Sequence, residues 1–350
     1  KLFYCRMKQI FKNYKFWLIL TATVFAGLIV VWFVLRNRNP LDVNVSHIKL
    51  DVKLERFDKT LFNKRIPLAQ RIQTLSEKYA NFFEVFNYDI IAIGGPENRS
   101  YVTYLQTFLD DYAVRQAYHA ADSVFSDTRW LDEKLTDGFK HYKYYYKNDE
   151  IPRVVAFVAG FNHSVVTMEG FVGVGLDKYL GAGCHLYPMM QIPEYACRQM
   201  TPERIPYDVM VALFQAKYPY DDTDENLLKR MIYEGKTLYF LDAMYPNDED
   251  SLKHAYRKRD VQYCMQFERD MWTFMIDRKV LFSTDYLTIR NYCDDSPYTK
   301  DFGIESPPRA GCWIGYKIVK SYMEHNKATL TELMEENDYQ KILNLSRYEP

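Results

Sequence analysis

The chain lacks the residue patterns that mark several common classes of enzyme. It has no GxSxG segment, which excludes a serine-hydrolase nucleophile elbow, and no GxxxxGK[ST] segment, which excludes a standard phosphate loop. No two of its seven histidines lie four residues apart, so an HExxH zinc site is excluded. Its six cysteines include no CxxC pair, which argues against a zinc ribbon or a thioredoxin-type site. The sequence therefore predicts no cofactor.

A large excess of charge of one sign is also lacking. The formal net charge is −1 over 350 residues, which gives no indication of nucleic-acid binding. Glycine and proline are modest at 14 each, whereas tyrosine (30) and phenylalanine (22) are abundant. This composition favours a dense aromatic core, with exposed aromatic surface that binds partners as the alternative.

A long apolar run near the start is the strongest feature that is present. Residues 16–35 carry no charge and would span about 30 Å as a helix, the thickness of a bilayer core. Trp17 and Trp32 lie near its ends, where indole rings favour the headgroup level. The run is longer than the apolar part of a signal peptide, no small-residue cleavage site follows it, and no lipid-accepting cysteine comes directly after it. We therefore expect an uncleaved transmembrane helix.

Basic residues indicate which way this helix is oriented. Residues 1–15 carry five lysines and arginines and form a predicted cytoplasmic tail, although Arg36 and Arg38 on the far side weaken the bias. A linker over residues 36–46 and a periplasmic domain over residues 47–350 would follow. The predicted protein is a single-pass protein of the inner membrane.

The predicted domain is α+β and mostly helical, with a small sheet. Alternating apolar residues predict a strand over His47–Asp58, and helical spacing follows, with a break at Pro67. Further helices are predicted over 101–118 and 120–148. The Val- and Gly-rich segment Pro152–Gly181 predicts two or three strands joined by tight turns, and helices dominate after Pro193. Thr329 and Glu332 fit a capping box before the last helix.

Residues able to bind metal are few. His163 and His185 flank the predicted sheet and would be weak metal candidates together with Glu194, although lone histidines are more often structural. Cys184 and Cys197 are the nearest pair for a disulfide in an oxidising compartment, and buried single thiols are the alternative.

One helical segment contains charges among apolar residues. Glu234 and Lys236 lie within the apolar pattern of residues 231–240. A buried Glu234 has to be paired or protonated, because an isolated buried charge is costly. We expect a Glu–Arg or Glu–Lys pair that holds helices together, with catalysis as the alternative.

Five segments in a fixed order carry a family resemblance. They are Arg56-Phe57-Asp58 with Leu61-Phe62, GVGLDKYLG, IPEYACRQM, MIYEGKTLYFLDAMYP, and PPRAGCWIGYKIVKSYM with the terminal Arg347–Pro350. From about residue 47 to the end, the chain resembles the gliding-motility lipoprotein B family of Bacteroidota. The positions that match the family, and are therefore candidate site residues, are Asp177, Glu194, Tyr195, Glu234, Gly235, Lys236, Arg309, Gly311, Trp313 and Gly315.

The resemblance implies an envelope protein required for, or encoded with, gliding and its associated secretion apparatus. The family is also distantly similar to zinc-peptidase-like proteins, in which a Glu-Gly helix supplies a metal ligand. Glu234-Gly235 would match that helix, while Tyr207–Val211 stands where HExxH would be expected. The resemblance therefore implies a peptidase scaffold without its metal.

Three hypotheses for the function follow. The first is a non-catalytic, membrane-anchored protein that docks other envelope proteins of a motility or secretion complex. The second is a membrane-tethered, metal-dependent hydrolase with ligands drawn from His163, His185, Glu194 and Glu234. The third is a module that binds a glycan or another small ligand on tyrosine and tryptophan rings.

Overall fold

The computed structural model describes Thr21, Phe25 and residues 39–350. The chain divides into two units, residues 1–43 and residues 44–350, and the second unit contains the sheet and all the helices discussed below. The predicted tail, and the predicted span over 16–35 with Trp17 and Trp32, lie outside the described residues apart from Thr21 and Phe25. Within the described part of the chain, no helix is both long enough and apolar enough to cross a bilayer.

A four-stranded mixed sheet lies at the centre of the first half of this unit. The strands are β1 (Leu54–Arg56), β2 (Arg153–Phe157), β3 (Val165–Met168) and β4 (Phe171–Gly175), in the spatial order β1-β2-β4-β3. β1, β2 and β4 run parallel, and β3 pairs with β4 in antiparallel orientation. The sheet and the surrounding helices confirm the predicted α+β class.

The expectation of tight turns between successive strands holds for one connection. Glu169-Gly170 joins β3 to β4 as a two-residue hairpin, and Gly170 adopts a φ of +77°, which glycine tolerates without steric cost. β2 does not pair with β3, because β4 lies between them. The connection from β2 to β3, residues 158–164, is therefore a wider loop rather than a tight turn.

The first strand is much shorter than the predicted strand over His47–Asp58. The backbone N–H groups of Val52 and Leu54 donate to the side chains of Thr136 and Asp132, at 2.9 Å each. These side chains come from a helix and satisfy the backbone donors on the open edge of β1, whose ladder with β2 covers three residues. Phe57 then begins the helix α2 (Phe57–Leu61).

Helices and rings cover the sheet. After Pro67 come α3 (Leu68–Val85), the π-helical turn η1 (Phe86–Ile90), α4 (Tyr101–Asp110), α5 (Tyr112–Val124) and α6 (Arg129–Tyr145). The two helices predicted over 101–118 and 120–148 are three in the structure. The first break falls at Asp111, whose carboxylate accepts the N–H of Val114 at 3.0 Å and starts α5. We call residues 54–178 the sheet region.

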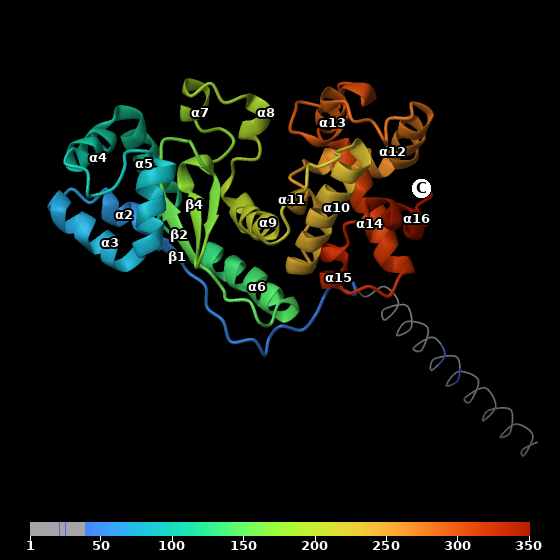
Figure 1. The fold of residues 1–350 in the computed structure, drawn as a ribbon, viewed down its shortest axis with the longest axis horizontal. Helices are drawn as coiled ribbons and strands as arrows, with labels where there is room; N and C mark the ends of the chain where they lie inside the picture. Colours follow the sequence, from blue (N-terminus) through green and yellow to red (C-terminus); the bar gives the residue numbers. More distant parts are fainter. Residues whose placement is uncertain (1–20, 22–24, 26–38) are drawn as a thin grey trace, which may run out of the picture. The chain divides into compact units, whose positions relative to one another are not determined.

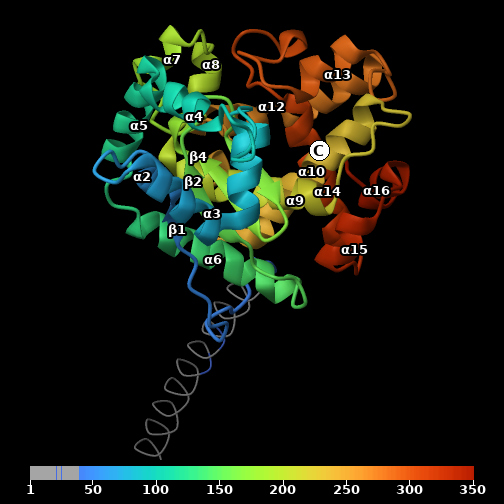
Figure 2. The same ribbon diagram turned by 60° about the vertical axis from the view of Figure 1, so that its left-hand side comes forward.

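The second half consists of helices joined by loops, as predicted. Its elements are η2 (Leu176–Lys178), α7 (Leu186–Met189), α8 (Glu194–Cys197), η3 (Pro202–Arg204), α9 (Ile205–Lys217), α10 (Leu227–Met244), α11 (Asp250–Lys253), α12 (Lys258–Asp277), α13 (Tyr286–Cys293), η4 (Lys300–Phe302), α14 (Ala310–His325), α15 (Leu330–Glu335) and α16 (Tyr339–Ser346). α9 contacts β3 and β4 as well as α10 (Figure 1). Figure 1 shows α10 and α12–α16 on the side of α9 away from the sheet, and Figure 2 shows α13–α16 together in a second view. We call residues 227–346 the helical region.

The predicted capping box is confirmed, but it does not open the last helix. Thr329 accepts the N–H of Glu332 at 3.2 Å, and the Glu332 carboxylate accepts the N–H of Thr329 at 2.7 Å. This box starts α15, and α16 follows it. Asp338 caps α16 by accepting the N–H of Lys341 at 2.8 Å. The sequence prediction missed this second cap.

Two glycines bring α10 and α14 into direct backbone contact. A Cβ on Gly235 would overlap the carbonyl group of Gly315, and a Cβ on Gly315 would overlap the carbonyl of Met231. A Cβ on Gly311 would lie 2.9 Å from the carbonyl oxygen of Tyr292 in α13. Side chains are therefore excluded at the crossing, as the GxxxG spacing of Gly311 and Gly315 predicts for tight helix contact.

Candidate functional site

The candidate positions on α10 and α14 meet in the helical region. Glu234, Gly235 and Lys236 come from α10, and Arg309, Gly311, Trp313 and Gly315 come from the start of α14. Since α10 and α14 pack together at the glycine crossing, these candidates form one neighbourhood.

Glu234 is paired with an arginine of its own helix. Arg230 Nε lies 3.1 Å from Glu234 Oε1, and the Glu234 side chain is only 19% exposed. Burial raises the pKa of Glu234, while the guanidinium groups of Arg230 and Arg309 oppose that rise. The predicted Glu–Arg pair is present. The expectation that it joins two helices is wrong, because Arg230 precedes Glu234 by one helical turn.

Arg309 ties the start of α14 to neighbouring segments. Its Nη2 donates to the carbonyl of His254 at 2.7 Å, and its Nε lies 3.0 Å from Asp295 Oδ1. The Tyr256 hydroxyl donates to the Arg309 carbonyl at 2.9 Å. Trp313, one turn further along, donates its Nε1–H to Glu268 at 3.2 Å. We call Arg230, Glu234, Asp295 and Arg309 the Glu234 cluster.

A second set of buried charges lies at the C-terminal half of α10. Lys253 contacts Asp242, and its Nζ lies 3.1 Å from Asp250. The Tyr316 hydroxyl donates to Asp242 at 2.6 Å. Burial favours the neutral form of Lys253, but the carboxylates of Asp242 and Asp250 outweigh it and raise the lysine pKa. The ion pair is therefore maintained inside the protein.

His254 lies next to these charges and is fully enclosed. Its ring packs against Tyr316 at 4.6 Å and Trp313 at 5.3 Å between centroids. Neither ring nitrogen has a hydrogen-bond partner among the described residues. Burial lowers the pKa of His254 to about 3, so the ring is neutral at physiological pH. A single histidine without a partner motif gives no signal in a sequence, so His254 could not be predicted as a site residue.

The other candidates do not join this neighbourhood. Asp177 is buried in the sheet region, where its Oδ2 accepts the N–H of Ala159 at 3.1 Å and that of Phe161 at 2.7 Å. Burial raises the pKa of Asp177, and these backbone hydrogen bonds oppose the rise. Phe161 has a φ of +70°, so the carboxylate holds an unusual turn after β2.

The proposed metal ligands are dispersed. Glu194 on α8 is 88% exposed and pairs with Arg198 at 3.0 Å, and Tyr195 beside it is half-buried. His163 lies in the loop before β3, and His185 is exposed before α7. In the described part of the chain, no group of three or more His, Cys, Asp or Glu residues is arranged to hold a metal ion.

The segment that stands where HExxH would be expected forms the start of α9. Asp208 pairs with Arg204 and accepts the Tyr179 hydroxyl at 2.9 Å. The Tyr207 hydroxyl donates to Asp248. The polar groups at this end of α9 are thus engaged by protein partners.

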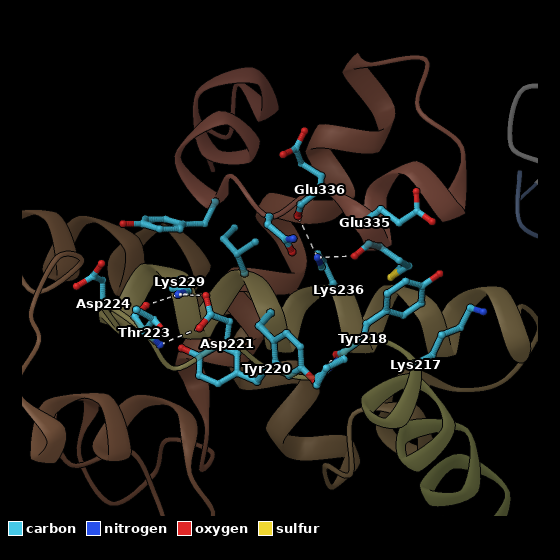
Figure 3. Close-up of a pocket in the computed structure, with 16 residues that line it drawn as sticks. Lys217, Tyr218, Tyr220, Asp221, Thr223, Asp224, Lys229, Lys236, Glu335 and Glu336 are labelled. Carbon is cyan, nitrogen blue, oxygen red and sulfur yellow. Dashed lines mark hydrogen bonds and ion pairs between the residues drawn. The ribbon is translucent and has the colours of Figure 1, made fainter. Parts of the chain in front are cut away.

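A pocket of about 630 Å³ opens on another side of α10. Figure 3 shows it between the loop after α9 and the segment from α15 to α16. The lining residues are Lys217, Tyr218, Pro219, Tyr220, Asp221, Thr223, Asp224, Lys229, Ile232, Tyr233, Lys236, Met334, Glu335, Glu336, Asn337 and Tyr339. We call it the tyrosine pocket.

Lys236 forms part of the wall of the tyrosine pocket. Its Nζ donates to the carbonyls of Met334 at 2.8 Å and Glu336 at 3.0 Å, where α15 ends (Figure 3). Burial lowers the pKa of Lys236 to about 8, against the effect of the Glu336 carboxylate. The lysine therefore satisfies carbonyls at a helix C-terminus, where a cation is favourable. The pocket could not be predicted from the sequence, because its two walls are separated by about a hundred residues of chain.

The fold and these contacts define a mixed α+β protein whose helical half is organised by paired buried charges and a glycine-lined helix crossing. A sequence model of the family described as gliding motility protein GldB matches residues 38–350, and the chain belongs to this family. The family is one of gliding-motility lipoproteins, so the predicted resemblance is confirmed. Comparisons with curated proteins and with solved structures give no match. The similarity to zinc-peptidase-like proteins stays a prediction.

Proposed function

We propose that this protein is a non-catalytic envelope component of a gliding-motility or secretion complex. Residues 16–35 would anchor it in the inner membrane, with the domain in the periplasm docking other envelope proteins. Family membership supports the link to gliding. The uncharged run supports the anchor, and the basic residues of the tail support its orientation. No cysteine comes directly after the run, so we propose an anchor formed by the helix itself and not by a lipid.

The pairing of the two key carboxylates is the observation that carries the non-catalytic role. Glu234 is held by Arg230, and Asp208 by Arg204 and Tyr179. A metal ligand or general base has to present lone pairs to the metal or substrate. Here a guanidinium group pairs with each carboxylate, and the Tyr179 hydroxyl donates to Asp208, which suits a structural role.

Glu234→Gln, with Arg230→Gln as its matched partner, tests this role in a strain lacking the chromosomal copy. If the pair is structural, each variant lowers stability by roughly 1–3 kcal/mol. Both should then restore gliding to the extent that the protein accumulates. Colony spreading and immunoblots of the same cultures measure the two quantities.

The hydrolase hypothesis makes the opposite prediction for the same pair of variants. A catalytic or ligating Glu234 would make Glu234→Gln non-gliding at wild-type protein levels, while Arg230→Gln would still glide. That result would contradict the non-catalytic role.

The tyrosine pocket favours small-ligand binding as a second candidate function. Its volume of about 630 Å³ lies within the range of roughly 300–1,000 Å³ that is usual for small-molecule sites. The rings of Tyr220 and Tyr233 are 4.8 Å apart but inclined by 55°, so this pair does not form the flat platform expected for a glycan. In a thermal-shift assay with a panel of amino acids and monosaccharides, we expect at least one compound to raise the melting temperature of the wild type but not that of Tyr339→Ala. A panel that shifts neither protein would count against this role.

A further inference from the structure

Two buried thiols meet where α13 ends and α14 begins. Cys293 is the last residue of α13, and Cys312 lies in the first turn of α14. The Cys312 thiol donates to the Cys293 carbonyl at 3.5 Å, and both residues are 3% exposed. Burial and then the neighbouring Cys312 side chain raise the pKa of the Cys293 thiol. The five described cysteines are free thiols in this structure.

The two chain segments that carry these cysteines are in direct contact one residue before each cysteine. A Cβ on Gly311 would lie 3.0 Å from the Cβ of Tyr292, and these residues directly precede Cys312 and Cys293. Disulfide-linked residues have Cβ atoms roughly 3.5–4.5 Å apart. The side chains of Cys293 and Cys312 interact by a hydrogen bond, so the two thiols are neighbours in the folded protein.

The chain between the two cysteines forms a closed loop held by weak bonds. The Thr299 N–H and hydroxyl both donate to the Pro307 carbonyl, at 3.0 and 2.9 Å. Arg309 and Asp295 pair across the ends of the loop. The charges of Glu234 and Arg230 act on the Cys293 thiol, which places the two cysteines beside the Glu234 cluster.

We propose that Cys293 and Cys312 form an intramolecular disulfide that covalently holds this loop against the Glu234 cluster. The two thiols lose two protons and two electrons as the sulfur–sulfur bond forms, and a disulfide of a periplasmic thiol oxidase accepts them and is reduced to two thiols. The oxidising compartment rests on the proposed periplasmic location. Since the folded site is closed and its thiolate form is disfavoured, the bond forms while the chain folds.

The nearest pair in sequence provides a competing assignment. Cys184 is half-buried and Cys197 is buried, and the Cys197 thiol donates to the Ile192 carbonyl at 3.7 Å. Cys264 provides an internal control. It is buried in α12, and after burial its pKa is raised by Asp260 and Glu268 rather than by a cysteine.

Thiol mapping of the full-length protein in its native membranes tests the proposal. Cells are quenched in acid, the protein is denatured and alkylated before and after reduction, and its peptides are identified by mass spectrometry. The expected result is a linked Cys293–Cys312 peptide that resists alkylation until it is reduced. Cys264→Ser should keep this link, whereas Cys312→Ser should leave Cys293 free to alkylate.

Protease accessibility in spheroplasts separates the two ways in which this test can fail. Suppose that the domain is accessible from the periplasm but carries free thiols at 293 and 312, or a Cys184–Cys197 bond instead. This result would overturn the proposed disulfide and leave the proposed location intact. A domain that is not accessible would overturn the location instead.

In that second case, refolding decides the disulfide. The reduced and denatured full-length chain is refolded in detergent with oxidised and reduced glutathione. Pairing of Cys293 with Cys312 would support the proposal, and random pairing or none would overturn it.

Discussion

The sheet region and the helical region achieve burial in different ways. In the sheet region, the ring centroid of Phe57 lies 5.2 Å from that of Phe82 and 4.8 Å from that of Phe86. The ring of Phe157 packs against that of Phe86. In the helical region, the polar side chains of Asp242, Lys253 and His254 are buried. Rings can be exchanged for others of similar volume at modest cost, whereas buried charges are favourable only when every partner is present.

Most candidate residues lie in the helical region. A residue in an aromatic core is constrained in volume, while a residue in a polar centre is constrained in chemistry and position. Glu234 and Arg309 belong to the second kind, and so do the glycines that allow α10 and α14 to approach.

Breaking the buried ion pair should have the largest effect. Lys253→Met leaves the Asp242 carboxylate buried with only the Tyr316 hydroxyl, and we expect a loss of about 3–5 kcal/mol in the free energy of unfolding. Adding Asp242→Asn removes the stranded charge and should recover about half of that loss. Urea denaturation in detergent measures both variants. Equal losses in the single and double variants would show that the pair is not coupled.

The titration of Lys236 should have the next largest effect. Its pKa in the folded protein is about 8 and its ordinary value is 10.5, so the unfolded chain binds more protons between these values. The free energy of unfolding should therefore rise from about pH 8 to about pH 10.5, by at most roughly 3 kcal/mol. A neutral amine still has two N–H donors for its two carbonyls, so the contacts persist.

Two lysine variants isolate this contribution. Lys236→Met should lose this rise, and Lys217→Met, a change of another lysine in the wall of the same pocket, should keep it. A rise that is identical in all three proteins would assign it to other groups.

A core substitution in the sheet region should have the smallest effect. Phe82→Leu removes ring contacts to Phe57 and Phe157 and should cost roughly 1–2 kcal/mol. This loss should be the same at pH 6 and pH 9, because the contacts to Phe57 and Phe157 that the change removes join uncharged rings. A strong pH dependence would show that the sheet region is not the apolar counterpart proposed here.

Local patterns predicted the elements but not their partners. The alternation and the Val-rich runs located the strands, and Pro67 and Thr329 marked helix starts, because these signals act within a few residues. The order β1-β2-β4-β3 could not be predicted, since it depends on contacts across a hundred residues. The predicted strand over His47–Asp58 was too long at its C-terminal end because Phe57 begins α2, and its open edge is covered by Thr136 and Asp132, which are distant in sequence.

The candidate site shows the same limit. A glutamate within an apolar helix predicted a buried ion pair. The spacing of four residues between Arg230 and Glu234 could also have identified the partner, because such residues are neighbours on a helix. The tyrosine pocket and the contact of Cys293 with Cys312 join segments through the fold, so no spacing in the sequence indicates them. Proximity in sequence pointed instead to Cys184 and Cys197.

The most direct test of the account is a double-mutant cycle on Arg230 and Glu234. The free energy of unfolding is measured for the wild type, Arg230→Gln, Glu234→Gln and the double variant. We predict a coupling energy of about 1 kcal/mol or more, because each residue's contribution depends on the other. A coupling near zero, together with loss of gliding only when Glu234 is changed, would contradict the structural role of the pair.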